Sequence, residues 1–199
     1  MQAVIRRELL VLTAIFPMWC ICAPARADEP PNAFVDRLIQ AGNGILSTGS
    51  DEDARQNCHR LLTWAFDVPA MAQYALGDAW GGASPSQRSA FRTAFENHIV
   101  ASFLRQVGSR RDKNILFVGN RPERDGQWLA ATQLNDQGNP GKTWIWRLRR
   151  NGANWRVVDV MINGTSMLYS ERQDYARVFQ SSHGNVDAVI DFVAKRRRP

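Results

Sequence analysis

Side chains with catalytic potential are few in this sequence and form no recognisable catalytic pattern. The three histidines, His59, His98 and His183, lack metal-ligand spacing, so we expect neither a metal site nor a cofactor. Ser166 does not stand in the Gly-x-Ser-x-Gly turn that presents a nucleophilic serine in hydrolases. Asp159, inside a strand-like run, is the remaining candidate for a catalytic base, but isolated acids of this kind usually pair with an arginine or a backbone N–H. We therefore expect a protein that is not an enzyme, with catalysis by Asp159 as an alternative.

Large apolar side chains, in contrast, are abundant for the length of the chain. Beyond residue 27 the sequence contains Trp64, Trp80, Trp128, Trp144, Trp146 and Trp155, together with Met71, Met161 and Met167. Aromatic rings and flexible methionines can line a cavity that accepts acyl chains of variable shape. An ordinary filled core requires the same residue types, so composition alone leaves both interpretations open.

The first half of the sequence has the apolar spacing of helices. Helices are predicted over 32–46, 50–66, 67–77 and 84–103. The last of these has the clearest start, because Ser84 can cap the helix, Pro85 suits its first position and Gln87 completes a capping box. His98 falls on the apolar face of this helix, where a core histidine with a hydrogen-bond partner is expected.

After Gly108 the pattern changes to short strands. Four strand-like runs cover 115–118, 127–134, 142–148 and 155–162, with turn residues between them, and two further helices are predicted over 167–180 and 186–197. Short connections favour an antiparallel meander. The order of helices, strands and helices predicts an α+β fold in which a helical layer packs on a curved four-stranded antiparallel sheet.

The segment 155–179 joins the last strand to an amphipathic helix. Val157, Val158, Val160 and Ile162 favour a strand, and Asn163-Gly164 then provides a turn. The helix that follows turns an apolar face towards the same corner. We interpret this corner as the floor of an apolar pocket.

The N-terminus resembles an export signal. Arg6 and Arg7 precede an apolar run over residues 9–22, and Ala25-Arg26-Ala27 is a small-residue cleavage pattern. A membrane anchor is the competing interpretation, but this run is shorter than the ~20 residues that a spanning helix needs, and Pro17 interrupts it. We expect residues 1–27 to be a signal peptide and residues 28–199 to form a single domain.

Net charge and cysteine content give two further expectations, one about partners and one about the core. Cleavage after Ala27 removes three arginines and one glutamate, which lowers the formal net charge from +6 to +4. Much of this charge lies in the run 195–198, which suits a solvated helix end, so we expect no nucleic-acid partner. Cys58 is the single cysteine beyond residue 27 and lies among helical apolar positions, so we expect a buried core thiol.

Three groups of residues resemble one known family. The segment from Phe66 to Trp80 resembles the pattern F-D-x-x-x-M-x-x-x-x-L-G-x-x-W of the MlaC family, and the helix from Ser84 to Phe95 resembles the one that follows it. The segment from Trp155 to Ser166 matches the pattern W-x-V-x-D-V-x-x-x-G-x-S, and Arg172 falls on an arginine of the closing helix. MlaC proteins are exported phospholipid-binding proteins, also called toluene-tolerance proteins. The resemblance extends over about 32–195.

This resemblance implies a periplasmic lipid carrier. The family holds acyl chains between sheet and helices and passes lipid between an inner-membrane ABC transporter and an outer-membrane lipoprotein complex, which maintains outer-membrane lipid asymmetry. A monomer without cofactor would suffice, because each buried CH₂ contributes about 0.8 kcal/mol. Trp146, Val158 and Tyr175 depart from common family residues, so a hopanoid, as in the related HpnM proteins, is an alternative ligand. An interaction module with a filled core is a third possibility.

We expect the lipid site to be one cavity shared by the helices and the last two strands. In particular, Trp146 and Val158 should face it from neighbouring strands, and the headgroup should lie at the mouth with few contacts. The expected lining is Met71, Tyr74, Trp80, Phe95, Ile99, Phe103, Trp146, Val158, Val160, Ile162 and Met167.

Overall fold

The computed structural model describes residues 29–108 and 112–196. The signal peptide expected at residues 1–27 lies outside this part of the chain. The helices are α1 (Pro31–Leu46), α2 (Asp51–Ala65), α3 (Val68–Leu76), α4 (Ala79–Gly82), α5 (Pro85–Val107), α6 (Met167–Ser181) and α7 (Val186–Lys195). The strands are β1 (Lys113–Pro122), β2 (Trp128–Asp136), β3 (Asn139–Asn151), β4 (Asn154–Ile162) and β5 (Thr165–Ser166), with a 3₁₀ turn (Arg124–Gly126) between β1 and β2.

Side-chain caps fix the starts of the helices where the sequence predicts them. Ser84 Oγ accepts a hydrogen bond from the Gln87 N–H, while Gln87 Oε1 accepts one from the Ser84 N–H, which confirms the capping box of α5. Ser50 caps α2 by accepting from the Asp53 N–H, and Asp67 caps α3 by accepting from the Ala70 N–H. These bonds satisfy N–H groups that have no partner inside the helix.

The sheet is an antiparallel meander in the order β1-β2-β3-β4-β5. The expected α+β fold is confirmed, with one strand more than expected. That strand, β5, is two residues long and forms a tight hairpin with β4. Asn163 and Gly164 both have positive φ, 51° and 80°, as a type I′ hairpin turn requires.

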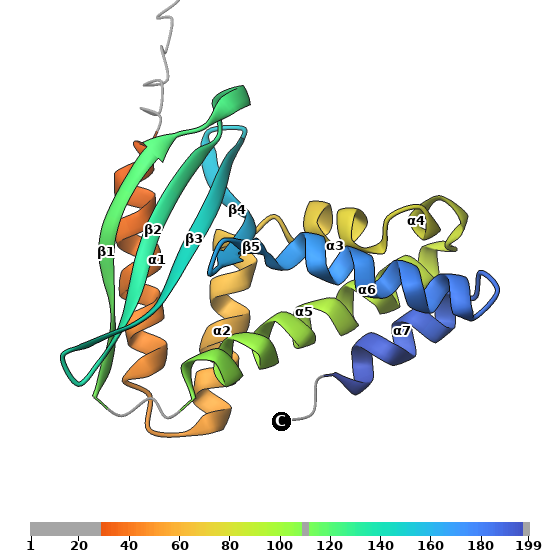
Figure 1. The fold of residues 1–199 in the computed structure, drawn as a ribbon, viewed down its shortest axis with the longest axis horizontal. Helices are drawn as coiled ribbons and strands as arrows, with labels where there is room; N and C mark the ends of the chain where they lie inside the picture. Colours follow the sequence, from red (N-terminus) through yellow and green to blue (C-terminus); the bar gives the residue numbers. More distant parts are fainter. Residues whose placement is uncertain (1–28, 109–111, 197–199) are drawn as a thin grey trace, which may run out of the picture.

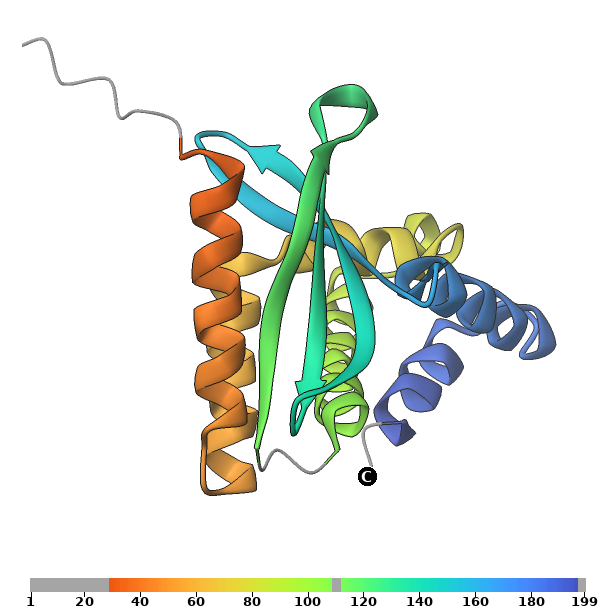
Figure 2. The same ribbon diagram turned by 60° about the vertical axis from the view of Figure 1, so that its left-hand side comes forward.

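Two groups of helices flank the sheet (Figure 1). Figure 2 shows α1 running along β1, and α2 lies between α1 and α5. The helices α3, α5, α6 and α7 pack on one another beside β4, and α5 reaches back to contact α2. The space enclosed by β3, β4, α2, α5 and the start of α6 is therefore bounded by elements from distant parts of the sequence.

A β-bulge interrupts the pairing of β3 with β4. Arg147 lies opposite Asp159 and Leu148 lies opposite Val157, so Val158 has no direct cross-strand partner. An extra residue in one strand shifts its alternation by one. Trp155 and Val157 before the bulge and Val160 after it are therefore buried, whereas Val158 turns the other way.

The outer edge of the sheet is partly closed by α1. The side chain of Asn43 donates from Nδ2 to the Ile115 carbonyl oxygen at 3.2 Å and accepts at Oδ1 from the Ile115 N–H at 2.6 Å. At Ile115, the Asn43 side chain thus makes the two hydrogen bonds that the backbone of a neighbouring strand would make. Beyond it Leu116, Phe117 and Val118 are exposed along β1.

Candidate functional site

An apolar cavity of about 330 Å³ lies between the sheet and the helices, and we call it the inner cavity. This volume lies within the range of about 300 to 1,000 Å³ typical of small-molecule sites. Its apolar lining consists of Cys58, Leu61, Leu62, Phe66, Ile99, Val100, Phe103, Trp144, Trp146, Val160, Ile162 and Met167, and its polar lining of Ser102, Arg105, Gln106, Glu171 and Arg196. The polar side chains come from the last two turns of α5, from α6 and from the end of α7.

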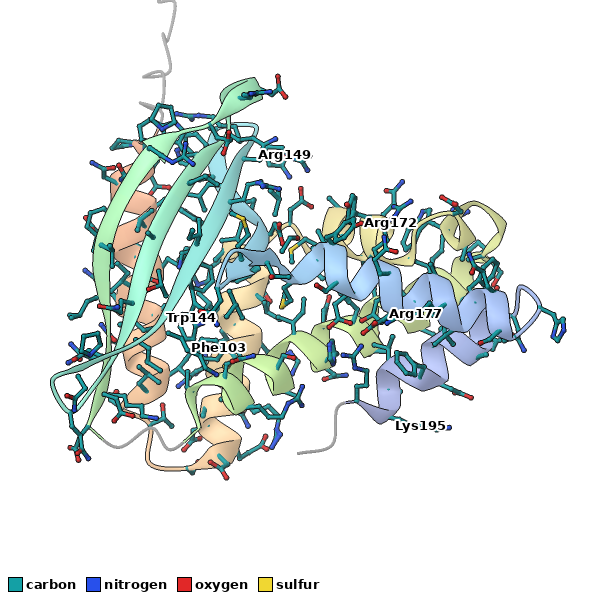
Figure 3. All side chains as sticks on the ribbon, in the orientation of Figure 1. Phe103, Trp144, Arg149, Arg172, Arg177 and Lys195 are labelled. Carbon is teal, nitrogen blue, oxygen red and sulfur yellow. The ribbon has the colours of Figure 1, made fainter. Side chains whose placement is uncertain are left out.

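Two cross-strand pairs form the sheet wall of the inner cavity. Trp144 lies opposite Ile162, and Trp146 lies opposite Val160. The two indole rings are 5.9 Å apart in an edge-to-face arrangement. Figure 3 shows Trp144 beside Phe103 of α5, and their ring centroids are 5.6 Å apart. Alternation along a strand places both tryptophans on one face, so the wall follows directly from the register of β3.

Six of the expected lipid-binding residues line the inner cavity together. They are Ile99, Phe103, Trp146, Val160, Ile162 and Met167. Two elements supply neighbouring members because of their periodicity: Ile99 and Phe103 are one helical turn apart on α5, and Val160 and Ile162 are two residues apart on β4.

Met71, Tyr74 and Val158 line a different depression, which we call the outer cleft. It has a volume of about 470 Å³ and also includes Arg147 and Arg149. The expectation that Val158 shares a cavity with Trp146 is wrong, because the bulge in β4 turns Val158 to the other side of the strand.

Phe95 and Trp80 line neither the inner cavity nor the outer cleft. Phe95 is completely buried and stacks on Phe91 at 5.9 Å, so it belongs to the core of the helical group. Trp80 is half-buried, with the guanidinium of Arg88 5.4 Å from the centroid of its ring.

A partly buried network around Glu171 closes the inner cavity on the side of α6. Glu171 Oε1 lies 2.8 Å from His98 Nε2, and its Oε2 accepts a hydrogen bond from Arg196 at 2.9 Å. Arg196 also donates to Asp174 at 3.0 Å. Burial alone would raise the pKa of Glu171, but the bonds and charges of His98 and Arg196 outweigh it and hold the pKa below its ordinary value. The expected core histidine, His98, therefore has the expected partner.

Asp159 has structural partners on both carboxylate oxygens. Its Oδ1 accepts hydrogen bonds from the N–H of Val160 at 2.8 Å and of Leu168 at 3.2 Å, and its Oδ2 lies 3.5 Å from the guanidinium of Arg147. Leu168 is in the first turn of α6, so Asp159 satisfies an N–H at the start of that helix. The carboxylate is almost fully buried, and its contacts are those of a residue that fixes the β4–α6 corner.

Several lining residues were not expected from the sequence. One apolar stripe of α2 contains Cys58, Leu61 and Leu62. The sequence predicts this stripe as a buried helix face, but it does not predict that the stripe borders a cavity. Trp144 could have been found, because it stands two residues from Trp146 in the same strand. Arg105 and Arg196 are brought together only by the packing of α5 on α7.

The described residues contain neither a metal cluster nor a membrane-spanning helix. Within residues 29–108 and 112–196, no cluster of three or more His, Cys, Asp or Glu side chains could hold a metal ion. Within the same residues, no helix has both the length and the hydropathy needed to cross a membrane.

Comparison with known proteins gives three similarities. The family model described as MlaC protein matches residues 35–195. The toluene tolerance protein ttg2D of Pseudomonas putida is 22% identical over 195 residues, which cover 96% of this chain and 90% of that protein. A phospholipid-binding protein from Ralstonia solanacearum, whose structure was solved in complex with a phospholipid, has a TM-score of 0.68 at 20% identity and covers 83% of this chain and 95% of its own. Because the family model matches most of its length, this chain belongs to the MlaC family.

Proposed function

We propose that this protein is a periplasmic carrier that holds the acyl chains of a phospholipid in the inner cavity. The observation that carries the proposal is the cavity itself, whose walls are mainly apolar and come from α2, α5, β3, β4, α6 and the end of α7. An acyl chain transferred from water to such walls gains about 0.8 kcal/mol per CH₂ group. The phospholipid bound to the structurally similar Ralstonia protein supports the same ligand class.

Membership of the MlaC family supports a transport role. The mature protein is a single domain that begins near Asp28, takes lipid from one membrane complex and delivers it to another. Its partners are an inner-membrane ABC transporter and an outer-membrane lipoprotein complex, and the exchange maintains outer-membrane lipid asymmetry. No catalytic step is needed, because the lipid is transferred unchanged.

Lipid analysis of the purified protein tests the proposal. Protein exported by a bacterial host and purified without detergent should yield close to one phospholipid per chain on extraction and mass spectrometry. Recovery of a hopanoid in place of phospholipid would support the HpnM-like alternative. Recovery of no lipid, together with failure to take up phospholipid from vesicles, would overturn the carrier function.

A transfer assay tests the second part of the proposal. Lipid-free protein should move a labelled phospholipid from donor to acceptor vesicles at a rate that rises with protein concentration. A protein that binds phospholipid but leaves this transfer rate unchanged would be a storage or interaction protein.

A further inference from the structure

The lining of the inner cavity is polar on the side that is nearest to solvent. Apolar lining residues such as Cys58 and Trp146 are buried, whereas Arg105 is exposed and the side chain of Arg196 is 34% exposed. We call this polar side the entrance. It consists of Ser102, Arg105, Gln106, Glu171 and Arg196.

Arg196 ties three helices together at the entrance. It is the C-cap residue of α7, which runs back along α5 from the far end of α6 (Figure 1). Its guanidinium donates to Glu171 Oε2 at 2.9 Å and to Asp174 Oδ2 at 3.0 Å, both on α6. Its carbonyl oxygen accepts a hydrogen bond from Arg105 on α5 at 3.2 Å. The bonds of one residue therefore hold the end of α7 across the entrance.

These bonds are of a kind that can break while the core stays folded. The side chains of Arg196 and Asp174 are 34% and 29% exposed, so water and salt compete with their contact. A helix end that is held by partly exposed bonds opens at a much lower free-energy cost than the core. The contact of Glu171 with His98, in contrast, is buried on both sides. Release of Arg196 would therefore open the entrance and leave the contact between α5 and α6 in place.

Tyr175 offers Glu171 a second partner. It follows Glu171 by one turn on the same helix, and its buried hydroxyl has no hydrogen-bond partner among the described residues. Burial and the nearby Glu171 carboxylate raise the pKa of Tyr175 above its ordinary value, so the hydroxyl keeps its proton and remains a donor. A buried donor without an acceptor is costly. Departure of Arg196 from Glu171 would supply the missing acceptor.

We infer that Arg196 is a gate that controls the access of lipid to the inner cavity. In the closed state, Arg196 binds Glu171 and Asp174 and holds the end of α7 across the entrance. In the open state, the last turn of α7 moves away and the Tyr175 hydroxyl donates to Glu171. The exchange of donors lowers the cost of opening, because the buried carboxylate keeps its full set of partners. This inference rests on the proposed function and adds a control of lipid access to it.

The gate is tested by the rates at which lipid enters and leaves. Lipid-free protein is mixed with a short-chain phosphatidylglycerol that has one fluorescent chain, below its critical micelle concentration. Energy transfer from the tryptophans of the cavity wall reports uptake, and dilution into unlabelled lipid reports release. Arg196→Gln should accelerate both rates by about threefold to tenfold, the range expected for partly exposed charged hydrogen bonds. Both rates should rise because lipid passes the gate in either direction.

Arg177→Gln is the matched control for this variant. Arg177, labelled in Figure 3, also donates to Asp174, but it lies on α6 itself and forms an ion pair within that helix. It lines neither the inner cavity nor the outer cleft. Loss of this cation should therefore leave uptake and release unchanged, although it removes the same charge from the same carboxylate.

Tyr175→Phe should have the opposite effect to Arg196→Gln. The open state loses its new hydrogen bond, whereas the closed state loses none, because the hydroxyl has no partner there among the described residues. Uptake and release should both slow by about threefold, since both depend on the fraction of open protein. A hydroxyl that served only the folded structure would leave these rates unchanged.

Salt tests the gate without any substitution. Raising the NaCl concentration from about 0.05 M to about 0.5 M weakens partly exposed ion pairs, so it should accelerate uptake by the wild type. The same change should have little effect on Arg196→Gln, because this variant has already lost the ion pairs of the gate.

The outcomes separate this inference from the carrier function. Unchanged rates in Arg196→Gln, or wild-type uptake that does not respond to salt, would overturn the gate and leave the carrier intact. Faster release with unchanged uptake would also overturn it, because a residue that only contacts the bound lipid behaves in this way. Unchanged rates in Tyr175→Phe would overturn the exchange of partners at Glu171. A wild type that takes up no lipid would overturn the proposed function itself.

Discussion

His98 Nε2 on α5 lies 2.8 Å from Glu171 Oε1 on α6, in a contact that is almost completely shielded from solvent. The other oxygen of Glu171 binds Arg196 at the end of α7. One carboxylate thus connects three helices beside the inner cavity.

The first prediction concerns the pH dependence of this network. Glu171→Gln should lower the free energy of unfolding by about 1 to 3 kcal/mol at pH 7, because it weakens charged hydrogen bonds. The pKa of Glu171 is lowered by folding from its ordinary 4.5, so its contribution is complete above that value and is lost as pH falls through the folded-state pKa. Urea titrations should therefore show the difference between variant and wild type shrinking below about pH 4.5. A stability difference between variant and wild type that stays constant between pH 3 and pH 7 would contradict this prediction. The control is Glu96→Gln, because Glu96 is also on α5 but forms no ion pair with a described residue.

The second prediction compares the same charge on two sides of β4. Ile99→Asp places a carboxylate in the inner cavity, whereas Val158→Asp places one in the outer cleft. An unpaired charge among acyl chains is costly, so folded Ile99→Asp protein should copurify with little phospholipid. Val158→Asp should retain it. The measurement is the amount of bound lipid per folded protein, with circular dichroism and melting temperature as checks of folding. Equal amounts of lipid in both variants would contradict the assignment of the lipid site to the inner cavity.

The third prediction concerns Asp159. Asp159→Ala should destabilise the protein by about 2 to 4 kcal/mol, because two buried N–H groups and Arg147 lose their partner. Asp159→Asn should cost less, since an amide oxygen can still accept at the start of α6. Urea unfolding checks the order. An Asp159→Asn variant with unchanged stability and an altered chemical activity would revive the catalytic alternative.

The fourth prediction concerns the edge of the sheet. Asn43→Ala should lower the unfolding free energy by about 1 to 3 kcal/mol, because the N–H and carbonyl of Ile115 both lose their partner. It should also increase self-association, because an open strand edge next to exposed Leu116, Phe117 and Val118 can pair with another chain. Light scattering over time measures this. Asn57→Ala is a suitable control, because Asn57 is in α2 and bonds the hydroxyl of Thr48.

The sequence by itself determined the main helices and strands and the family of this protein. Ser84 and Gln87 predict the start of α5 because a helix start depends on bonds between near neighbours, and the structure contains those bonds. Short turns between β-rich runs predicted the meander for the same local reason. The segments around Met71 and Asp159 pointed to the MlaC family, which the match over residues 35–195 confirms.

Only the tertiary structure decided which apolar residues border the inner cavity. Phe95 and Ile99 occupy the same face of α5, yet Phe95 is packed in the helical core and Ile99 lines the inner cavity. Periodicity cannot distinguish them, because the position of a cavity depends on how helices from distant parts of the sequence pack against the sheet. Val158 was misplaced because a bulge, which apolar alternation does not reveal, moved it to the other side of β4. Trp144 and Trp146 are equivalent by periodicity, and only the three-dimensional contact with Thr132 leaves one indole satisfied and the other without a partner among the described residues.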